Sequence, residues 1–137
     1  MKLIRPISLV LLCIAFVPSL AADKKPLTKE ESAKVIEAAI RKSLKKPTGE
    51  LTKADLEKVR ELYLVDDQLT DVKGLEKLTQ LKCLYLNKNK LTDVKGLEKF
   101  TQLKFLILDG NPALTKAQID ELKKALPDCK IEHNAKK

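Results

Sequence analysis

Residues 69–77 read Leu-Thr-Asp-Val-Lys-Gly-Leu-Glu-Lys, and residues 91–99 read the same. The identity extends outward from this stretch, since Val59–Gln80 and Leu81–Gln102 are both 22 residues long and share 14 identical positions. Self-similarity at a fixed short period is the signature of a repeat protein, in which each unit is one turn of a solenoid. A single turn cannot bury its own leucines, so neighbouring turns must stack to withdraw them from water.

A third copy of the repeat begins at Leu103. This copy and the one that begins at Leu81 both read Leu-x-x-Leu-x-Leu-x-x-Asn, whereas the first copy has Asp67 in place of the Asn. We predict a short strand over the Leu-x-Leu of each unit, followed by a bend and a return segment. Asn89 and Asn111 are interpreted as structural, because an amide both donates and accepts hydrogen bonds at an internal bend.

The 22-residue pattern Leu-x-x-Leu-x-Leu-x-x-Asn resembles the short leucine-rich repeats of bacterial proteins, the subclass that includes the internalins. The resemblance implies an α/β solenoid: a right-handed coil with a parallel β-ladder on its concave face and 3₁₀ return segments, here over residues 59–113. It also implies protein-protein recognition through the concave face, although the fold does not identify the ligand.

A helical N-terminal cap is expected over residues 22–58. Thr28-x-x-Glu31 is a capping box at a helix start, and Thr52-x-x-Asp55 starts a second short turn. Apolar residues at helical spacing follow the first box, at Ala33, Ile36, Ile40 and Leu44. Such a helix covers the leucines of the first repeat. Contact with a membrane is the alternative, which the mixed charges of the helix disfavour.

Residues 114–137 are predicted to form a C-terminal helical cap and a last strand. Thr115-x-x-Gln118 is a further capping box, and Pro127 ends the helix. The helical stripe that follows the box consists of Ile119, Leu122, Ala125 and Leu126.

The two cysteines beyond the first segment are predicted to lie on opposite faces of the strands. Leu126-x-x-Cys129-x-Ile131 repeats the leucine pattern with Cys129 at an inward position, which predicts a buried thiol. Cys83 precedes an inward leucine and therefore points outward. The sulfurs would be about 10 Å apart, so no intramolecular disulfide is expected, while an intermolecular one through Cys83 stays open.

The first 21 residues read as a signal peptide. Lys2 and Arg5 precede an apolar run, and small residues follow it, with cleavage expected after Ala21 or Ala22. The run is too short for a conventional transmembrane helix, so we expect an exported chain, periplasmic or secreted, without a transmembrane segment in its mature form. An uncleaved anchor and lipidation at Cys13 are the disfavoured alternatives.

Alternation along the strands places a cluster of large side chains on the predicted concave face. The predicted partner-binding residues are Tyr63, Tyr85, Phe105, Ile107, Val65 and Asn87. Aromatic residues are common interface anchors, but they also favour strands for packing reasons, so simple packing along the ladder is the alternative interpretation.

Composition limits the other function classes. The chain has a formal charge of +8 and a single His, His133, so neither a two-histidine metal site nor a catalytic triad is expected. We expect no enzyme activity, no cofactor and no nucleic-acid partner. The partner is predicted to be a protein or peptide. The alternative is a structural envelope component that adheres to anionic polymers through its lysines.

Overall fold

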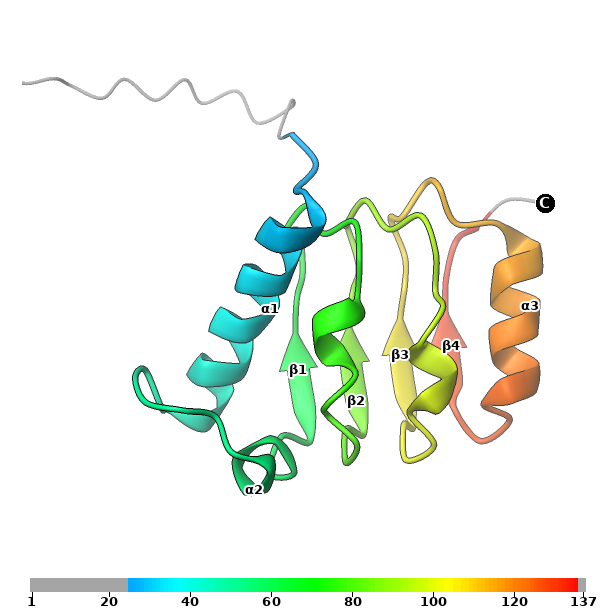
Figure 1. Cartoon of the computed structure of the whole chain (residues 1–137). Helices are drawn as coiled ribbons and strands as arrows, with labels where there is room; N and C mark the ends of the chain where they lie inside the picture. The colour runs from blue at the N-terminus through cyan, green and yellow to red at the C-terminus, as the bar shows by residue number, and fades with distance from the viewer. Residues whose placement is uncertain (1–24, 136–137) are drawn as a thin grey trace, which may run out of the picture.

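A computed structural model describes residues 25–135 of the chain (Figure 1). The predicted signal peptide at 1–21 lies outside the described residues. The elements, with η for a 3₁₀ helix, are α1 (Lys29–Leu44), α2 (Lys53–Leu56), β1 (Glu61–Tyr63), η2 (Lys73–Leu75), β2 (Cys83–Tyr85), η3 (Leu97–Lys99), β3 (Phe105–Ile107), α3 (Lys116–Ala125) and β4 (Lys130–Glu132).

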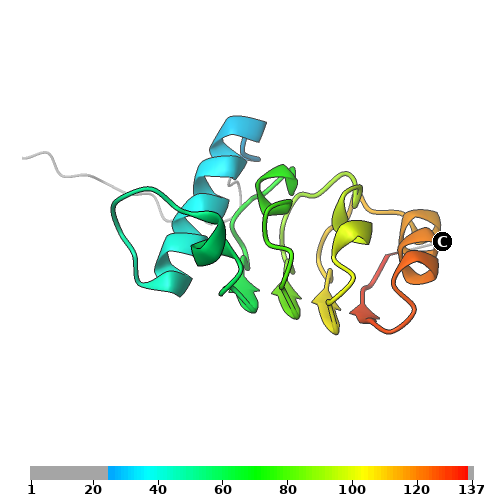
Figure 2. The same ribbon diagram turned by 60° about the horizontal axis from the view of Figure 1, so that its bottom comes forward.

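The strands form one parallel sheet in the order β1-β2-β3-β4. Their register follows the repeat, with Leu62 beside Leu84 and Leu84 beside Leu106. Figure 2 shows the strands in a row along one side of the molecule and the return segments, including η2 and η3, along the other. The predicted leucine-rich repeat solenoid and its 3₁₀ return segments are therefore confirmed.

The space between the strands and the return segments is filled by the repeated apolar residues. Each position of the pattern is buried in every turn, and Phe100 occupies the place that Leu78 has one turn earlier. Removing one leucine side chain from water contributes about 1.5 to 3 kcal/mol, so the stacked leucines supply the main stabilisation of the fold. In the first repeat the buried leucines are Leu62, Leu64, Leu69, Leu75 and Leu78.

Asparagine side chains join neighbouring turns at the bends, as the sequence predicted. The buried amide of Asn89 donates to the carbonyl of Leu64 at 2.6 Å and accepts from the backbone N–H of Leu69 at 3.1 Å. Asn111 connects the next two turns in the same way. Both residues therefore satisfy backbone groups that the solenoid would otherwise bury without partners.

Both predicted capping boxes are present, at the starts of α1 and α3, and the predicted second short turn is α2, which also begins with a capping box. The buried stripe of α1 differs from the prediction, because Ala33 is exposed and Ser32 faces the core instead, four residues before Ile36. The Ser32 hydroxyl accepts a hydrogen bond from the backbone N–H of Thr70 at 3.3 Å, which explains how a polar residue is tolerated there. On α3, Ala125 is likewise exposed rather than buried.

The predicted register of the last strand is wrong by two residues. Ile131, not Cys129, lies beside Leu106, and Cys129 is half-buried just before β4. Residue 131 follows residue 106 by 25 positions, against 22 between Leu84 and Leu106. The last return segment is the α-helix α3, which rises only about 1.5 Å per residue against about 2.0 Å in a 3₁₀ helix, so it takes more residues to cross the molecule.

Candidate functional site

The outward side chains of the four strands form two rows across the sheet, which we call the outer strand face. The row nearer the strand starts is Glu61, Cys83, Phe105 and Lys130. The row nearer the strand ends is Tyr63, Tyr85, Ile107 and Glu132. Both rows follow the predicted alternation over β1 to β3, and β4 adds a charged residue to each row.

The six predicted partner-binding residues are brought together on or beside this face. Tyr63 is 60% exposed, Phe105 49% and Val65 40%, and these are the exposed large hydrophobic residues of the described chain. Tyr85, Ile107 and Asn87 are half-buried. Exposing three large apolar side chains on one small sheet is unfavourable in water unless something covers them.

The two tyrosines hold each other in place. Their rings stack with centroids 4.4 Å apart and planes inclined by 8°. The Tyr63 hydroxyl donates to a carboxylate oxygen of Glu61 at 3.2 Å, and this hydrogen bond raises the pKa of Tyr63 above its ordinary value. The stack and the hydrogen bond together limit rotation of the Tyr63 ring.

Both described cysteines are free thiols, and both are half-buried. Burial raises the pKa of the Cys83 thiol, and it raises the pKa of Cys129 to about 11. A thiol with a raised pKa is a poor nucleophile near neutral pH. Cys83 therefore contributes apolar surface to the face between Glu61 and Phe105.

A hollow of about 480 Å³ adjoins the face where α1 passes β1. Its lining consists of Ala39, Lys42, Ser43, Glu61 and Tyr63. Ala39, Lys42 and Ser43 come from α1 and were not predicted as site residues, since the sequence indicated only a helix that covers the first repeat. Their 3- and 4-residue offsets from Ala39 place them on one side of the helix, a signal that becomes useful only once the helix is seen beside β1.

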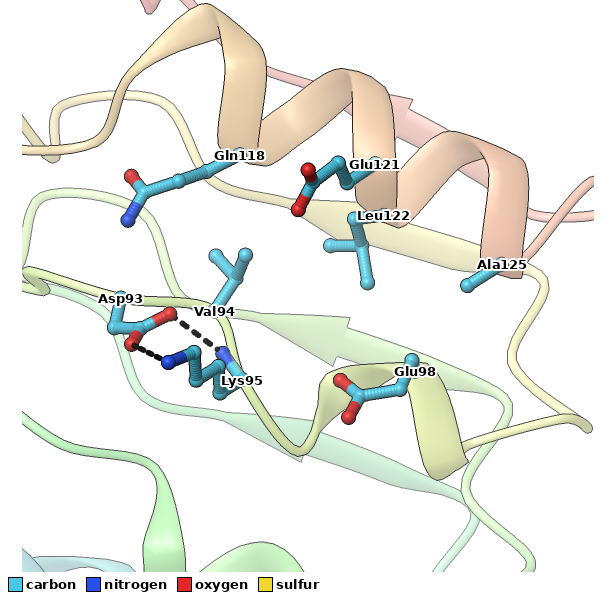
Figure 3. Close-up of a pocket in the computed structure, with 8 residues that line it drawn as sticks. All are labelled: Asp93, Val94, Lys95, Glu98, Gln118, Glu121, Leu122 and Ala125. Carbon is cyan, nitrogen blue, oxygen red and sulfur yellow. Dashed lines mark hydrogen bonds and ion pairs between the residues drawn. The ribbon is translucent and has the colours of Figure 1, made fainter.

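A second hollow, of about 350 Å³, lies on the opposite side of the molecule between η3 and α3 (Figure 3). Asp93, Glu98 and Glu121 contribute carboxylates to it, and Asp93 accepts a hydrogen bond from the backbone N–H of Lys95 at 2.9 Å. Within residues 25–135 no group of three or more His, Cys, Asp or Glu side chains is arranged to hold a metal ion. The two hollows thus differ in kind, since the first is continuous with the exposed aromatic cluster.

Comparison with known proteins points to the same architecture. A family model described as leucine-rich repeats (2 copies) matches residues 57–99 and 79–124. Among the curated proteins none matches this chain. No helix in the described part of the chain is long and apolar enough to cross a membrane.

Two internalins of Listeria monocytogenes are similar in structure. One, inlF, has a TM-score of 0.62 and 24% identity, and the match covers 75% of this chain and 31% of the internalin. The other, internalin C2, has a TM-score of 0.62 and 26% identity, and the match covers 71% of this chain and 42% of the internalin. The chain therefore spans less than half the length of either.

Proposed function

The chain is a leucine-rich repeat protein similar to the internalins, and on that premise we propose that it is an exported binding module. It recognises a protein or peptide through the outer strand face. The observation that carries this proposal is the exposed cluster of Tyr63, Val65 and Phe105 around the stacked Tyr85. Aromatic side chains held in one orientation on a rigid sheet are the usual anchors of protein interfaces.

The size of the face supports a small partner. Four strands at a spacing near 4.8 Å span about 15 Å, enough for a peptide or one edge of a protein. A standard interface buries about 800 Å² on each partner, which exceeds the outer face of four three-residue strands. We therefore propose a peptide-sized partner segment.

Export is part of the proposal and rests on residues 1–21, whose basic start and apolar run are typical of a signal peptide. Expression of the full chain with separate analysis of cell and exported fractions tests it. We expect the exported protein to begin at Ala22 or Asp23 by mass spectrometry. An intact chain that stays inside the cell would refute export.

A second candidate function is electrostatic adhesion to anionic envelope polymers. It is favoured by the formal charge of +8, nearly all of it from lysine. Binding of this kind weakens steeply with salt, because exposed charges are screened. It should also be indifferent to the aromatic residues of the outer strand face.

Selection from a peptide library displayed on phage separates the two candidates. The baits are the mature protein, the triple variant Tyr63→Ala, Tyr85→Ala, Phe105→Ala, and a control with Lys73→Ala, Lys77→Ala and Lys99→Ala, which are exposed in the return segments. We expect enriched peptides to bind the wild type and the control in high salt, and to fail on the aromatic triple variant.

The opposite pattern would refute the proposal. Peptides that bind wild type and triple variant alike, and are lost from both in high salt, would establish electrostatic adhesion. Circular dichroism and thermal unfolding of each bait show that it is folded, so that loss of binding is not mistaken for loss of structure.

A further inference from the structure

Three basic residues stand side by side at the edge of the outer strand face. Arg60, Lys82 and Lys104 each come immediately before β1, β2 and β3, and all three are exposed. Their backbones are in register, since the N–H of Lys82 donates to Arg60 at 2.7 Å and that of Lys104 donates to Lys82 at 2.8 Å. We call these three residues the basic row.

The charges of the basic row are available to a ligand. Among the ion pairs of the described residues, none includes Arg60, Lys82 or Lys104. Glu61 is the acid beside the row, and it keeps its negative charge while it accepts a hydrogen bond from the Tyr63 hydroxyl, so the row exceeds it by two charges.

The opposite edge of the face has a different charge pattern. Asp66 and Asp109 lie beyond the strand ends, and Lys88 lies between them along the ladder. The charges of β4 cancel within the strand, since the ammonium of Lys130 forms an ion pair with the carboxylate of Glu132 at 3.0 Å. Charges that look mixed along the chain are therefore sorted by the ladder, with three basic residues against the one carboxylate of Glu61 at this edge of the apolar cluster.

The hollow beside α1 brings one further basic residue close to this edge, opposite Glu61. Lys42 is exposed, lines the hollow with Glu61 and Tyr63, and belongs to none of the ion pairs of the described residues. Adjacent strands are about 4.8 Å apart, so the basic row spans about 10 Å, and it lies one residue before the row that contains Phe105. An extended segment that runs along the strands would cross basic groups first and aromatic groups next.

We propose that the segment bound by the outer strand face is acidic and apolar in succession, with a run of Asp or Glu beside large apolar residues. The carboxylates meet the basic row, and the apolar side chains cover Tyr63, Tyr85 and Phe105. This inference rests on the proposed function and specifies its partner. Charge complementarity of this kind selects among partners and speeds association more than it adds affinity.

Three synthetic peptides test the proposal by fluorescence anisotropy with the mature chain. The first has three acidic residues joined to Leu-Phe-Leu, the second has three lysines joined to the same Leu-Phe-Leu, and the third has three acidic residues joined to three alanines. Each peptide is made in two versions, one with the charged run at the N-terminal end and one with it at the C-terminal end. We expect the acidic apolar peptide to bind at least about tenfold more tightly than both others.

Charge reversal sharpens the test. Lys82→Glu with Lys104→Glu should invert the preference, so that the lysine peptide binds more tightly than the acidic one. The control, Lys73→Glu with Lys77→Glu, makes the same change in net charge at exposed positions of a return segment and should leave the preference unchanged.

Each other outcome overturns the acidic partner. Equal binding of the acidic and lysine apolar peptides, lost in the aromatic triple variant, would retain the outer strand face as the site but not its charge preference. Equal binding of the acidic alanine and acidic apolar peptides would favour electrostatic adhesion. If no peptide binds below about 1 mM, this inference fails, while the library selection decides the proposed function independently.

Discussion

The nine identical residues at 69–77 and 91–99 have different backbones. In the first stretch the 3₁₀ helix η2 covers Lys73–Leu75, whereas in the second η3 covers Leu97–Lys99 rather than the equivalent 95–97. Gly96 has φ of +95°, in the left-handed region, and Gly74 does not. Identical sequence therefore does not decide the conformation of the return segment.

The surroundings of the two stretches account for the difference. The first lies under α1, where a Cβ added to Gly74 would stand 3.3 Å from Ile36 Cγ2 and where the Thr70 hydroxyl donates to the carbonyl of Leu27 at 2.7 Å. The second faces the hollow beside α3, and nothing lies within 4 Å of a Cβ added to Gly96. We infer that the cap helix selects between two backbones that the repeat permits.

The largest expected effect comes from Asn89 and Asn111, which lie one turn later and accept hydrogen bonds from the backbone at the start of each stretch. Asn89 accepts from the N–H groups of Asp67 and Leu69, whereas Asn111 accepts from that of Leu91 alone. Since each buried backbone group left without a partner costs about 1 to 3 kcal/mol, we expect Asn89→Ala to lower the free energy of unfolding by about 3 kcal/mol or more. Urea unfolding should show a smaller loss for Asn111→Ala. If Asn111→Ala lowers the free energy of unfolding as much as Asn89→Ala or more, the two asparagines do not differ as the hydrogen bonds indicate.

A larger side chain at Gly74 tests whether α1 confines the backbone of the first stretch. We expect Gly74→Val to lower the free energy of unfolding by about 1 to 3 kcal/mol, because the added atoms overlap Ile36. In the background Ile36→Ala the same substitution should cost much less, which a double-mutant cycle in urea measures. Additive effects of the two substitutions would show that Ile36 does not confine Gly74.

The second glycine should respond to backbone strain instead of crowding. We expect Gly96→Ala to cost about 1 kcal/mol, because an alanine is strained at positive φ even though space is open around it. Gly96→Asn should cost less, since asparagine tolerates the left-handed region better. Thermal unfolding of the two variants measures this order. If Ala and Asn are equally tolerated, the second stretch does not need its left-handed residue.

The smallest effect is a difference in acid sensitivity between the two ends. The ion pair with Lys46 holds the pKa of Asp55 well below its usual range, and the backbone N–H of Thr28 lowers the pKa of Glu31. A carboxyl with a lowered folded-state pKa stabilises the fold above its unfolded-state pKa, near 4, and this contribution is lost as the pH falls through the folded-state value. The capping box of α3 uses the neutral Gln118 and has no such dependence, so the carboxyl of that helix with a lowered pKa is Asp120, through its hydrogen bond with Lys116.

Melting temperatures measured from pH 6 down to about pH 2 test this asymmetry. We expect the wild type to lose stability below about pH 4, Asp55→Asn to lose less over the same interval, and Gln118→Glu to lose more. Parallel acid profiles for all three proteins would show that the capping carboxyls do not cause the acid sensitivity.

The repeat and its ladder could be predicted because the period of the leucines sets both the turn and the register. The same alternation placed Tyr63, Tyr85 and Phe105 on one face correctly. The position of Cys129 was predicted wrongly because α3 uses more residues than a 3₁₀ segment. The place of Lys42 in the hollow beside β1 was not predicted, because local sequence does not say which strand a helix packs against. Arg60, Lys82 and Lys104 are also 22 residues apart, so the same period groups them at one edge of the sheet.

Local pattern thus determined the stacked turns, the buried leucines, the asparagine bends and the capping boxes, since each depends on residues a fixed number of positions apart. The backbone of each return segment and the hollow beside β1 were decided by packing between distant segments. The physical reason is that a short peptide has several backbones of similar free energy, and we infer that packing as local as that of Ile36 over Gly74 selects one of them.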